Sequence, residues 1–227
     1  MKPLRITRFL LIAMAAFCVW TFNSCQVVEL VISGTTYYET EITTKDNQLI
    51  AGQIGGQRSS NLPFGAKTIS IKTEEGRKKV KSEEIKYMTL ARKNHPEKRQ
   101  TLVYAEFKMP YTKKGEQKFR TFKNWQILNS VGDHLLITAY GHTYSLAKDG
   151  ALIITYSRDE GIQYCIQRQS DDCPILIGRS ISSRSYMRKQ WQAYLADDPV
   201  LCEKIAKKEI DAFDFTAITE QYNPVGK

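Results

Sequence analysis

Turn signals interrupt the chain at short intervals between residues 36 and 180, and the segments between them have the length of single β-strands. The first strand candidates are residues 36–44, 49–54, 67–72, 78–81 and 84–90. Residues 67–72 alternate apolar and polar side chains, which is the period of a strand with one buried face. Short strands separated by such turns predict a small barrel or a sandwich for residues 36–92.

A second run of strand candidates follows the polar residues 93–100, which we interpret as a linker. Its members are residues 101–109, 119–129, 135–140, 152–157, 162–168 and 174–177. Glycines in the intervening turns supply backbone conformations that other residues disfavour. The strand order of residues 36–92 is similar to that of small SH3-like and Sm-like barrels. The predicted fold is therefore mainly β, with such a barrel followed by a second antiparallel module in residues 101–180.

The C-terminal segment, residues 183–223, changes to helical periodicity. Apolar and aromatic side chains recur there at helical spacing: Met187, Trp191, Tyr194 and Leu195. This spacing predicts an amphipathic helix over residues 183–196. Asp198 precedes a proline, which predicts a capped second helix over residues 200–210. Asp214 is the candidate cap of a last short helix, so the prediction is two to three short helices.

The N-terminus has the pattern of a secretory signal. Residues 1–8 carry three cations and no acidic residue, and residues 9–22 form an apolar run. A small residue and then Cys25 follow, and this resembles the cleavage site of bacterial lipoproteins. We therefore expect residues 1–25 to be a lipoprotein signal, with Cys25 carrying lipid that anchors the exported protein in the outer membrane or periplasm. The alternative is an uncleaved anchor extended to Ile32, which places polar residues near the bilayer core.

Positive charge is concentrated in residues 60–125, which hold 17 Lys or Arg and 7 Asp or Glu. The flanking residues 26–59 and 126–227 each carry a net charge of −2. Such a band suits an anionic envelope lipid or an envelope protein, and we regard nucleic acid as a disfavoured partner. The candidate lipid contacts form one hairpin tip and its return strand: Arg77, Lys78, Lys79 and Lys81. The alternative is that lysines solvate the strands and discourage edge-to-edge aggregation.

Two of the cysteines have a spacing that suggests a disulfide. Cys165 and Cys173 lie symmetrically about Gln169, so a hairpin with a three-residue loop would place them opposite each other. Opposed strand positions approach bridging distance after small backbone adjustment, and an exported protein occupies a compartment where disulfides persist. The alternative is two small buried hydrophobic residues. No cysteine spacing indicates a zinc site.

Two segments resemble parts of uncharacterised, lipoprotein-like exported proteins of Bacteroides-type bacteria. They are Lys-Ser-Glu-Glu-Ile-Lys-Tyr-Met at residues 81–88 and Tyr-Leu-Ala-Asp-Asp-Pro-Val-Leu-Cys-Glu-Lys-Ile at residues 194–205. The resemblance extends over most of the mature chain and implies an envelope location. Those proteins carry no assigned activity, so the resemblance implies no catalytic or binding residue.

The sequence contains no recognisable catalytic, cofactor or metal motif. The histidines are scattered, and catalysis would require His134 or His142 to meet a carboxylate or hydroxyl in one cleft. His95 precedes a proline in the expected linker. The pairs Asp171–Asp172 and Asp197–Asp198 fit a hairpin tip and a helix cap better than a calcium or acid–base site.

Three aromatic residues are candidates for stacking on a sugar or a base: Trp125, Tyr140 and Tyr144. At strand positions, however, such residues are more often part of the core. We predict a non-catalytic, membrane-tethered binding or assembly module without a cofactor. The alternatives are a structural or immunity-type lipoprotein that acts by occupying a partner, and an envelope hydrolase assembled around His134 and His142.

Overall fold

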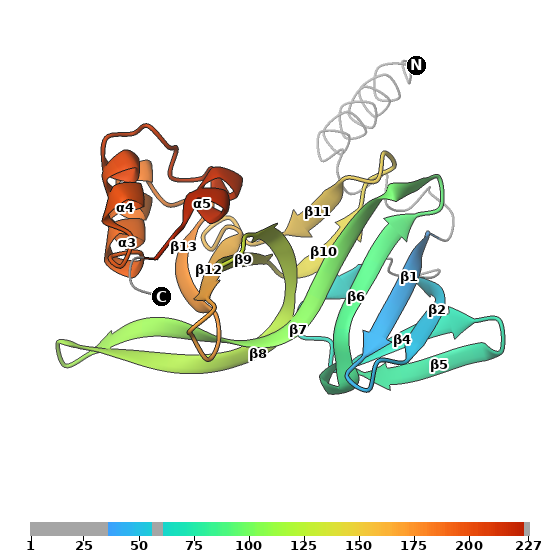
Figure 1. The fold of residues 1–227 in the computed structure, drawn as a ribbon. Helices are drawn as coiled ribbons and strands as arrows, with labels where there is room; N and C mark the ends of the chain where they lie inside the picture. Colours follow the sequence, from blue (N-terminus) through green and yellow to red (C-terminus); the bar gives the residue numbers. More distant parts are fainter. Residues whose placement is uncertain (1–35, 56–60, 225–227) are drawn as a thin grey trace, which may run out of the picture. The chain divides into compact units, whose positions relative to one another are not determined.

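The computed structural model describes residues 36–55 and 61–224, so the expected signal peptide and Cys25 lie outside the described residues. Every described helix and strand belongs to one compact unit, Tyr37–Lys227. The fold is mainly β with three short C-terminal helices, as predicted (Figure 1). Across residues 36–55 and 61–224, no helix is both long enough and apolar enough to span a membrane.

Thirteen strands and three helices make up the described residues. The strands are β1 (Tyr37–Thr44), β2 (Leu49–Gly55), β3 (Leu62–Pro63), β4 (Thr68–Thr73), β5 (Gly76–Lys81), β6 (Ile85–Arg92), β7 (His95–Lys113), β8 (Glu116–Val131), β9 (Leu135–Tyr140), β10 (Thr143–Leu146), β11 (Leu152–Thr155), β12 (Gln163–Arg168) and β13 (Ile175–Arg179). The helices are α3 (Arg184–Tyr194), α4 (Pro199–Ala206) and α5 (Phe215–Gln221), and a 3-10 turn, Ser82–Glu84, precedes β6.

Ten strands form one sheet in the order β13-β12-β9-β8-β7-β6-β1-β2-β4-β5, and β11-β10-β3 form a second sheet. The neighbours are antiparallel, and a parallel contact also joins β13 to β7 at Ile175 and Lys108. The large sheet runs through both expected β modules. The predicted linker at residues 93–100 is wrong, because Arg92 pairs with His95 and a tight turn leads directly from β6 into β7.

The first hydrophobic core, here called the strand core, is built from strand side chains. Its largest buried members are Tyr38, Ile42, Ile71, Ile85, Met88, Leu90, Leu102, Phe107, Trp125 and Tyr144. Period-two alternation explains its composition: β1 buries every second residue, and β4 buries Ile69 and Ile71 between exposed neighbours. The strand core therefore depends on the register that brings distant strands together.

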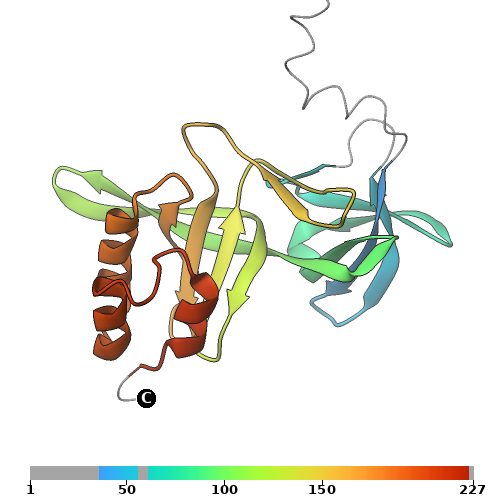
Figure 2. The ribbon, with the colours of Figure 1, turned by 90° about the horizontal axis from the view of Figure 1, so that it is seen from above.

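The second hydrophobic core, here called the helix core, lies between the helices and the strands β9, β12 and β13 (Figure 2). Its buried residues include Leu135, Ile137, Ile166, Ile177, Met187, Trp191, Leu195, Leu201, Ile205, Phe215 and Ile218. The residues at helical spacing in α3 supply Met187 and Trp191, as the periodicity predicts. The C-terminal helices are thus bound to the sheet by apolar packing.

The helix boundaries follow capping chemistry. Asp198 accepts a hydrogen bond from the backbone N–H of Leu201, and Asp214 caps α5 in the same way, as predicted. The second helix ends at Ala206 instead of Ile210. Lys208 adopts a left-handed φ of 66°, which ends the helix.

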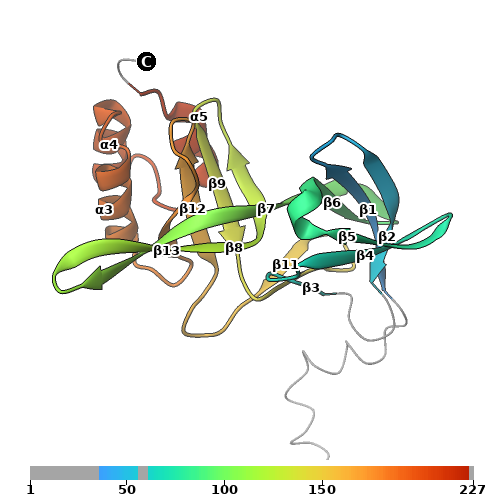
Figure 3. The ribbon, with the colours of Figure 1, turned by 90° about the horizontal axis from the view of Figure 1, so that it is seen from below.

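The longest hairpin joins β7 to β8. Its strands extend beyond the predicted residues 101–109 and 119–129 and pair as far as Lys113 and Glu116. Residues 112–122 are exposed, and Figure 3 shows this distal part running on beyond the neighbouring strands. Lys114 and Gly115 form the tip with positive φ, which is the expected turn.

Candidate functional site

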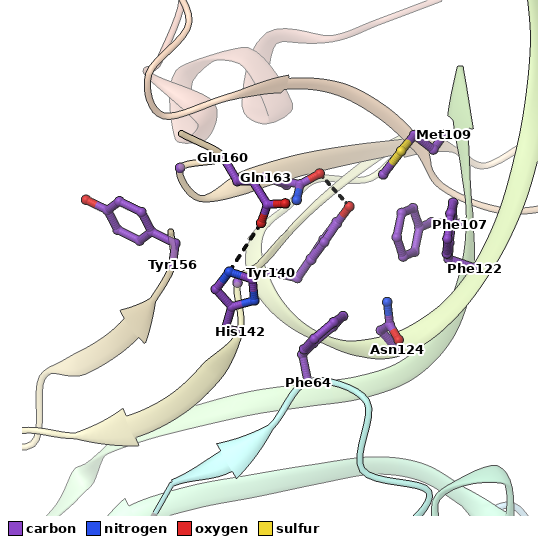
Figure 4. A pocket seen from close by; sticks show the side chains of 12 residues that line it. Phe64, Phe107, Met109, Phe122, Asn124, Tyr140, His142, Tyr156, Glu160 and Gln163 are labelled. Carbon is purple, nitrogen blue, oxygen red and sulfur yellow. Dashed lines mark hydrogen bonds and ion pairs between the residues drawn. The ribbon is translucent and has the colours of Figure 1, made fainter. Parts of the chain in front are cut away.

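A cavity of about 240 Å³ is walled mainly by aromatic side chains. The aromatic residues that line it are Phe64, Phe107, Phe122, Tyr140 and Tyr156 (Figure 4). A small concave site with apolar walls and a few polar groups is the usual form of a ligand pocket. We therefore take this cavity, here called the aromatic pocket, as the candidate functional site.

Strand register positions the wall of the aromatic pocket. Phe107 of β7 and Phe122 of β8 are cross-strand partners, and their ring centroids lie 5.7 Å apart. Tyr140 at the end of β9 packs 4.7 Å from Phe107. Cross-strand aromatic pairs of this kind stabilise a sheet and hold the rings in place. Phe107 and Tyr140 are also members of the strand core, which fixes this part of the wall.

Phe64 completes the wall from a different part of the chain. It directly follows β3, and its ring is stacked near Tyr140 with centroids 6.4 Å apart. Its backbone N–H donates to the carbonyl of His142 at 3.0 Å, and its carbonyl accepts from the N–H of Trp125 at 2.7 Å. These two backbone hydrogen bonds connect the segment after β3 to His142 and to β8.

Polar side chains form the remainder of the aromatic pocket. The hydroxyl of Tyr140 donates to Oε1 of Gln163 at 2.7 Å, and burial raises the pKa of Tyr140 well above its ordinary value. Nε2 of His142 lies 3.2 Å from Oε2 of Glu160, and both side chains are about half exposed. Asn124 also points into the cavity (Figure 4). The pocket therefore combines aromatic faces with amide, carboxylate and imidazole groups.

A close backbone approach places His142. A Cβ on Gly141 would lie 2.5 Å from the carbonyl oxygen of Thr155, so only glycine fits at this position. The N–H of His142 donates to that same carbonyl at 2.7 Å. Glu160 lies in the turn before β12 that Gly161 closes, where the sequence predicts a turn. Two turns thus bring the imidazole and the carboxylate together.

The histidines considered as catalytic candidates do not converge. His142 lines the aromatic pocket, whereas His134 lines a separate hollow with Arg168 and Tyr222. His95 contacts Glu97 at 3.2 Å on the surface. The hydrolase site expected around both His134 and His142 is therefore not assembled in the described residues, and Glu160 is the group that meets His142.

All three aromatic stacking candidates are buried residues of the strand core. The indole N–H of Trp125 donates to the carbonyl of Ala66 at 3.0 Å, and the hydroxyl of Tyr144 donates to the carbonyl of Trp125 at 2.6 Å. Both side chains are fully buried in the strand core, so neither offers a face to a ligand. Tyr140 alone of the three lines the aromatic pocket.

The aspartate pairs have structural contacts. Asp198 caps α4, which confirms one interpretation, and Asp171 lies in the β12–β13 turn, where it contacts Arg168 and the hydroxyl of Tyr194. Asp197 accepts from the hydroxyl of Tyr222 at 2.8 Å. Within residues 36–55 and 61–224, no group of three or more potential ligands has a metal-binding arrangement.

The expected register of the cysteine hairpin is wrong. Cys165 faces Leu176 across the hairpin, and Cys173 lies in the turn of residues 169–174, which is longer than the three-residue loop expected. Both thiols are free in the structure, and burial raises the pKa of Cys165. The disulfide itself stays a prediction, to be tested by peptide mapping of oxidised protein without reduction. Recovery of both residues as free thiols would contradict it.

The basic band is divided between two hairpins. Arg77, Lys78, Lys79 and Lys81 are exposed on β5, which is an edge strand of the large sheet. A second group of cations, Lys113, Lys114, Lys118 and Arg120, is exposed on the distal β7–β8 hairpin. The sheet order places β4, β2, β1 and β6 between β5 and β7. Two basic hairpins, and not one continuous strand face, therefore account for much of the excess charge.

Comparison with protein-family models, with curated proteins and with solved structures finds no match.

Most residues of the aromatic pocket were not predicted from the sequence. Phe64, Phe107, Phe122, Glu160 and Gln163 were not among the candidates, because they lie on separate elements and belong to no motif. A signal did exist at residues 119–122, where two phenylalanines interrupt a strongly charged strand. Of these two residues, Phe122 lines the aromatic pocket.

Proposed function

We propose that this chain is a non-catalytic binding module of the bacterial envelope, anchored by lipid at Cys25, and that the aromatic pocket is its ligand site. The observation that carries this proposal is the combination of aromatic walls with polar side chains at the pocket. Among the described residues that line it there is no serine, threonine, cysteine or lysine, and its carboxylate, Glu160, contacts His142. Binding without covalent chemistry is the function that such a site supports best.

The anchor rests on the N-terminal pattern alone. Metabolic labelling with a palmitate analogue tests it, because a lipidated Cys25 should incorporate the label and Cys25→Ser should not. Unchanged labelling of Cys25→Ser would rule out this attachment site. An uncleaved anchor would instead leave residues 1–24 on the purified protein, which intact-mass measurement detects.

The strand order of residues 37–92 supports the proposal that this part of the fold is an SH3-like or Sm-like barrel. Their strands lie in the order β6-β1-β2-β4-β5, and the 3-10 turn Ser82–Glu84 precedes β6. Barrels of this class are frequent scaffolds for binding, although a fold does not specify a ligand. The exposed cations of β5 form the proposed contact with anionic envelope lipid.

Two alternatives remain from the sequence. A structural or immunity-type lipoprotein would act by occupying a partner protein and would leave the aromatic pocket empty. An envelope hydrolase is favoured by one observation, the contact between His142 and Glu160 at the pocket. That pair could activate water if a substrate carbonyl or acetal lay within reach.

A ligand-observed NMR screen of the full-length protein tests the proposal. The library should contain neutral sugars, quaternary ammonium compounds, aromatic acids and short-chain lipids. We expect binding that Phe122→Ala weakens and Phe119→Ala leaves unchanged. These two residues lie on the same strand and are 39% and 48% exposed, but only Phe122 lines the pocket. Absence of any pocket ligand would contradict the proposal, and turnover that Glu160→Gln abolishes would favour the hydrolase.

A further inference from the structure

The aromatic pocket has little charge to attract an ion. Its described lining contains no lysine, arginine or aspartate, and its one carboxylate, Glu160, is already paired with His142. An anion would find no cation there other than a protonated imidazole. A quaternary ammonium would meet a single, half-exposed carboxylate that already contacts His142, and charge complementarity contributes strongly to such binding. The site therefore favours a neutral ligand.

The size of the pocket limits the ligand to a small ring. Its volume of about 240 Å³ lies below the range of roughly 300–1,000 Å³ typical of pockets for drug-sized molecules. Tyr156 and Phe122 are partly exposed at the pocket, so a larger ligand can continue into solvent. A ligand with one ring inside the pocket and the remainder of the molecule in solvent would satisfy both observations.

The chemistry of the lining requires a ligand with an apolar face and polar edges. The faces of aromatic rings carry negative charge density and attract weakly positive C–H groups. The side-chain amides of Asn124 and Gln163 each carry donors and an acceptor, and Glu160 adds acceptors. A purely apolar ligand would take these polar groups out of water without replacing their hydrogen bonds, which costs free energy.

A sugar ring has both properties, because its axial C–H groups form an apolar face and its hydroxyls lie around the edge. Resting on the proposed function, we infer that the aromatic pocket binds one neutral sugar ring, either as a residue of an envelope glycan or as a free sugar. The ring stacks on Phe122, which is 39% exposed, and Tyr140 lies buried behind the pocket. The sugar hydroxyls bond to Asn124, Gln163 and Glu160, whose side chains line the pocket (Figure 4).

Calorimetric titration of the full-length protein with defined saccharides tests this inference. The probes are methyl hexopyranosides, methyl N-acetylhexosaminides and linear oligosaccharides of the same residues. The protein must be held in a detergent without a sugar headgroup, because an alkyl glycoside would compete. A glycan as the source predicts that an oligosaccharide binds at least as tightly as its methyl glycoside, and a free sugar predicts the reverse.

Matched variants assign the binding to the pocket. We expect Phe122→Ala to lower the affinity about tenfold or more, since stacking on one aromatic ring contributes that much in comparable sites. Asn124→Ala should lower it about fivefold or more by removing hydrogen bonds to hydroxyls. Phe119→Ala is the control and should bind like the parent protein. Asn124→Ala leaves every aromatic contact in place, so it tests the site even if Phe122→Ala folds poorly.

The outcomes separate this inference from the proposed function. Saccharide binding that Asn124→Ala weakens supports the inference. If no saccharide binds but another class of compound binds the pocket in the NMR screen, the inference of a sugar ligand is overturned and the proposed binding function stands. If no ligand of any class binds the pocket, both the inference and the proposed function are overturned.

Discussion

The strand core and the helix core each contain one fully buried tryptophan whose indole N–H donates to a backbone carbonyl. Trp125 bonds to Ala66, 59 residues away in the chain, and Trp191 bonds to Ala212, 21 residues away. The helix core is therefore built largely from local segments docked on three strands. The strand core depends on contacts between distant strands. We therefore expect the two cores to respond differently to similar substitutions.

The largest effects are expected from removing the two tryptophans. Trp125→Ala and Trp191→Ala should each destabilise the protein by about 3–5 kcal/mol, because a large buried side chain leaves a cavity. Small domains have roughly 5–15 kcal/mol of stability in total, so these losses are severe. Chemical denaturation measures the loss of stability, and hydrogen exchange locates it.

Hydrogen exchange decides whether the two cores unfold separately. We expect Trp191→Ala to accelerate amide exchange mainly in α3, α4 and α5, since these segments depend on the helix core. Trp125→Ala should accelerate it throughout the large sheet. Uniform acceleration in both variants would show that the two cores unfold as one cooperative unit.

Two glycines allow a smaller test of how each core tolerates extra volume. A Cβ on Gly52 would meet the backbone carbonyl of Lys72, and a Cβ on Gly178 would meet the flexible end of Met187. Overpacking costs about 1–3 kcal/mol. We expect Gly52→Ala near the upper end and Gly178→Ala near the lower end, because a methionine side chain can move and a paired strand cannot.

Thermal denaturation compares these variants. Gly65→Ala is the matched control, since a Cβ there meets no atom within 4 Å and the backbone needs no left-handed φ. It should change stability by less than about 0.5 kcal/mol. Equal losses for Gly52→Ala and Gly178→Ala would indicate that the helix core packs as rigidly as the strand core.

A pH-dependent contribution is expected where the β12–β13 turn meets α3. Burial alone would raise the pKa of Asp171, but hydrogen bonds from Tyr194 and from Arg168 outweigh it and hold the pKa below its ordinary value. A lowered carboxylate pKa stabilises the fold above the unfolded value of about 3.9, and the stabilisation disappears as pH falls through the folded value. Asp171→Asn should therefore destabilise the protein at neutral pH by roughly 1–2 kcal/mol.

Denaturation as a function of pH tests this assignment. The gap between the parent protein and Asp171→Asn should narrow below about pH 4, because the parent carboxyl is then protonated as well. A gap that stays constant between pH 7 and pH 3 would mean that the loss comes from packing and not from charge.

The sequence predicted the helix core better than the strand core. Helical spacing in α3 and the caps at Asp198 and Asp214 are local signals, and the structure confirms them. In the strand region most strands were predicted, but β3 and β10 were missed. β3 has only two residues, and β10 is a four-residue segment between glycine-containing turns. Register could not be predicted either, which is why the expected placement of Cys165 opposite Cys173 in the hairpin was wrong.

The aromatic pocket could not be predicted from local sequence signals, for a related reason. Tyr140 and His142 were both considered, but neither residue indicates its partners. Phe107 and Tyr140 belong to the strand core and also line the cavity, so an interpretation as core is correct but incomplete. Only the sheet register shows which core residues border the cavity.

The smallest effects on folding are expected from the two basic hairpins, which lie outside both cores. Replacing Arg77, Lys78, Lys79 and Lys81 with Gln should change stability little, at most about 0.5 kcal/mol for each exposed position. The matched variant replaces Lys113, Lys114, Lys118 and Arg120 with Gln. Each cation near an anionic membrane contributes about 1 kcal/mol, so binding should change much more than stability.

Flotation of the Cys25→Ser protein with liposomes separates the two hairpins. If β5 contacts anionic lipid, the first variant should lose binding to vesicles that contain phosphatidylglycerol, and the second should retain most of it. Binding should also weaken as salt rises, because screening acts over about 8–10 Å at physiological ionic strength. Equal losses would indicate a nonspecific response to net charge. No preference for anionic over neutral vesicles at low salt would leave lysine as a solvating and anti-aggregation residue on an edge strand.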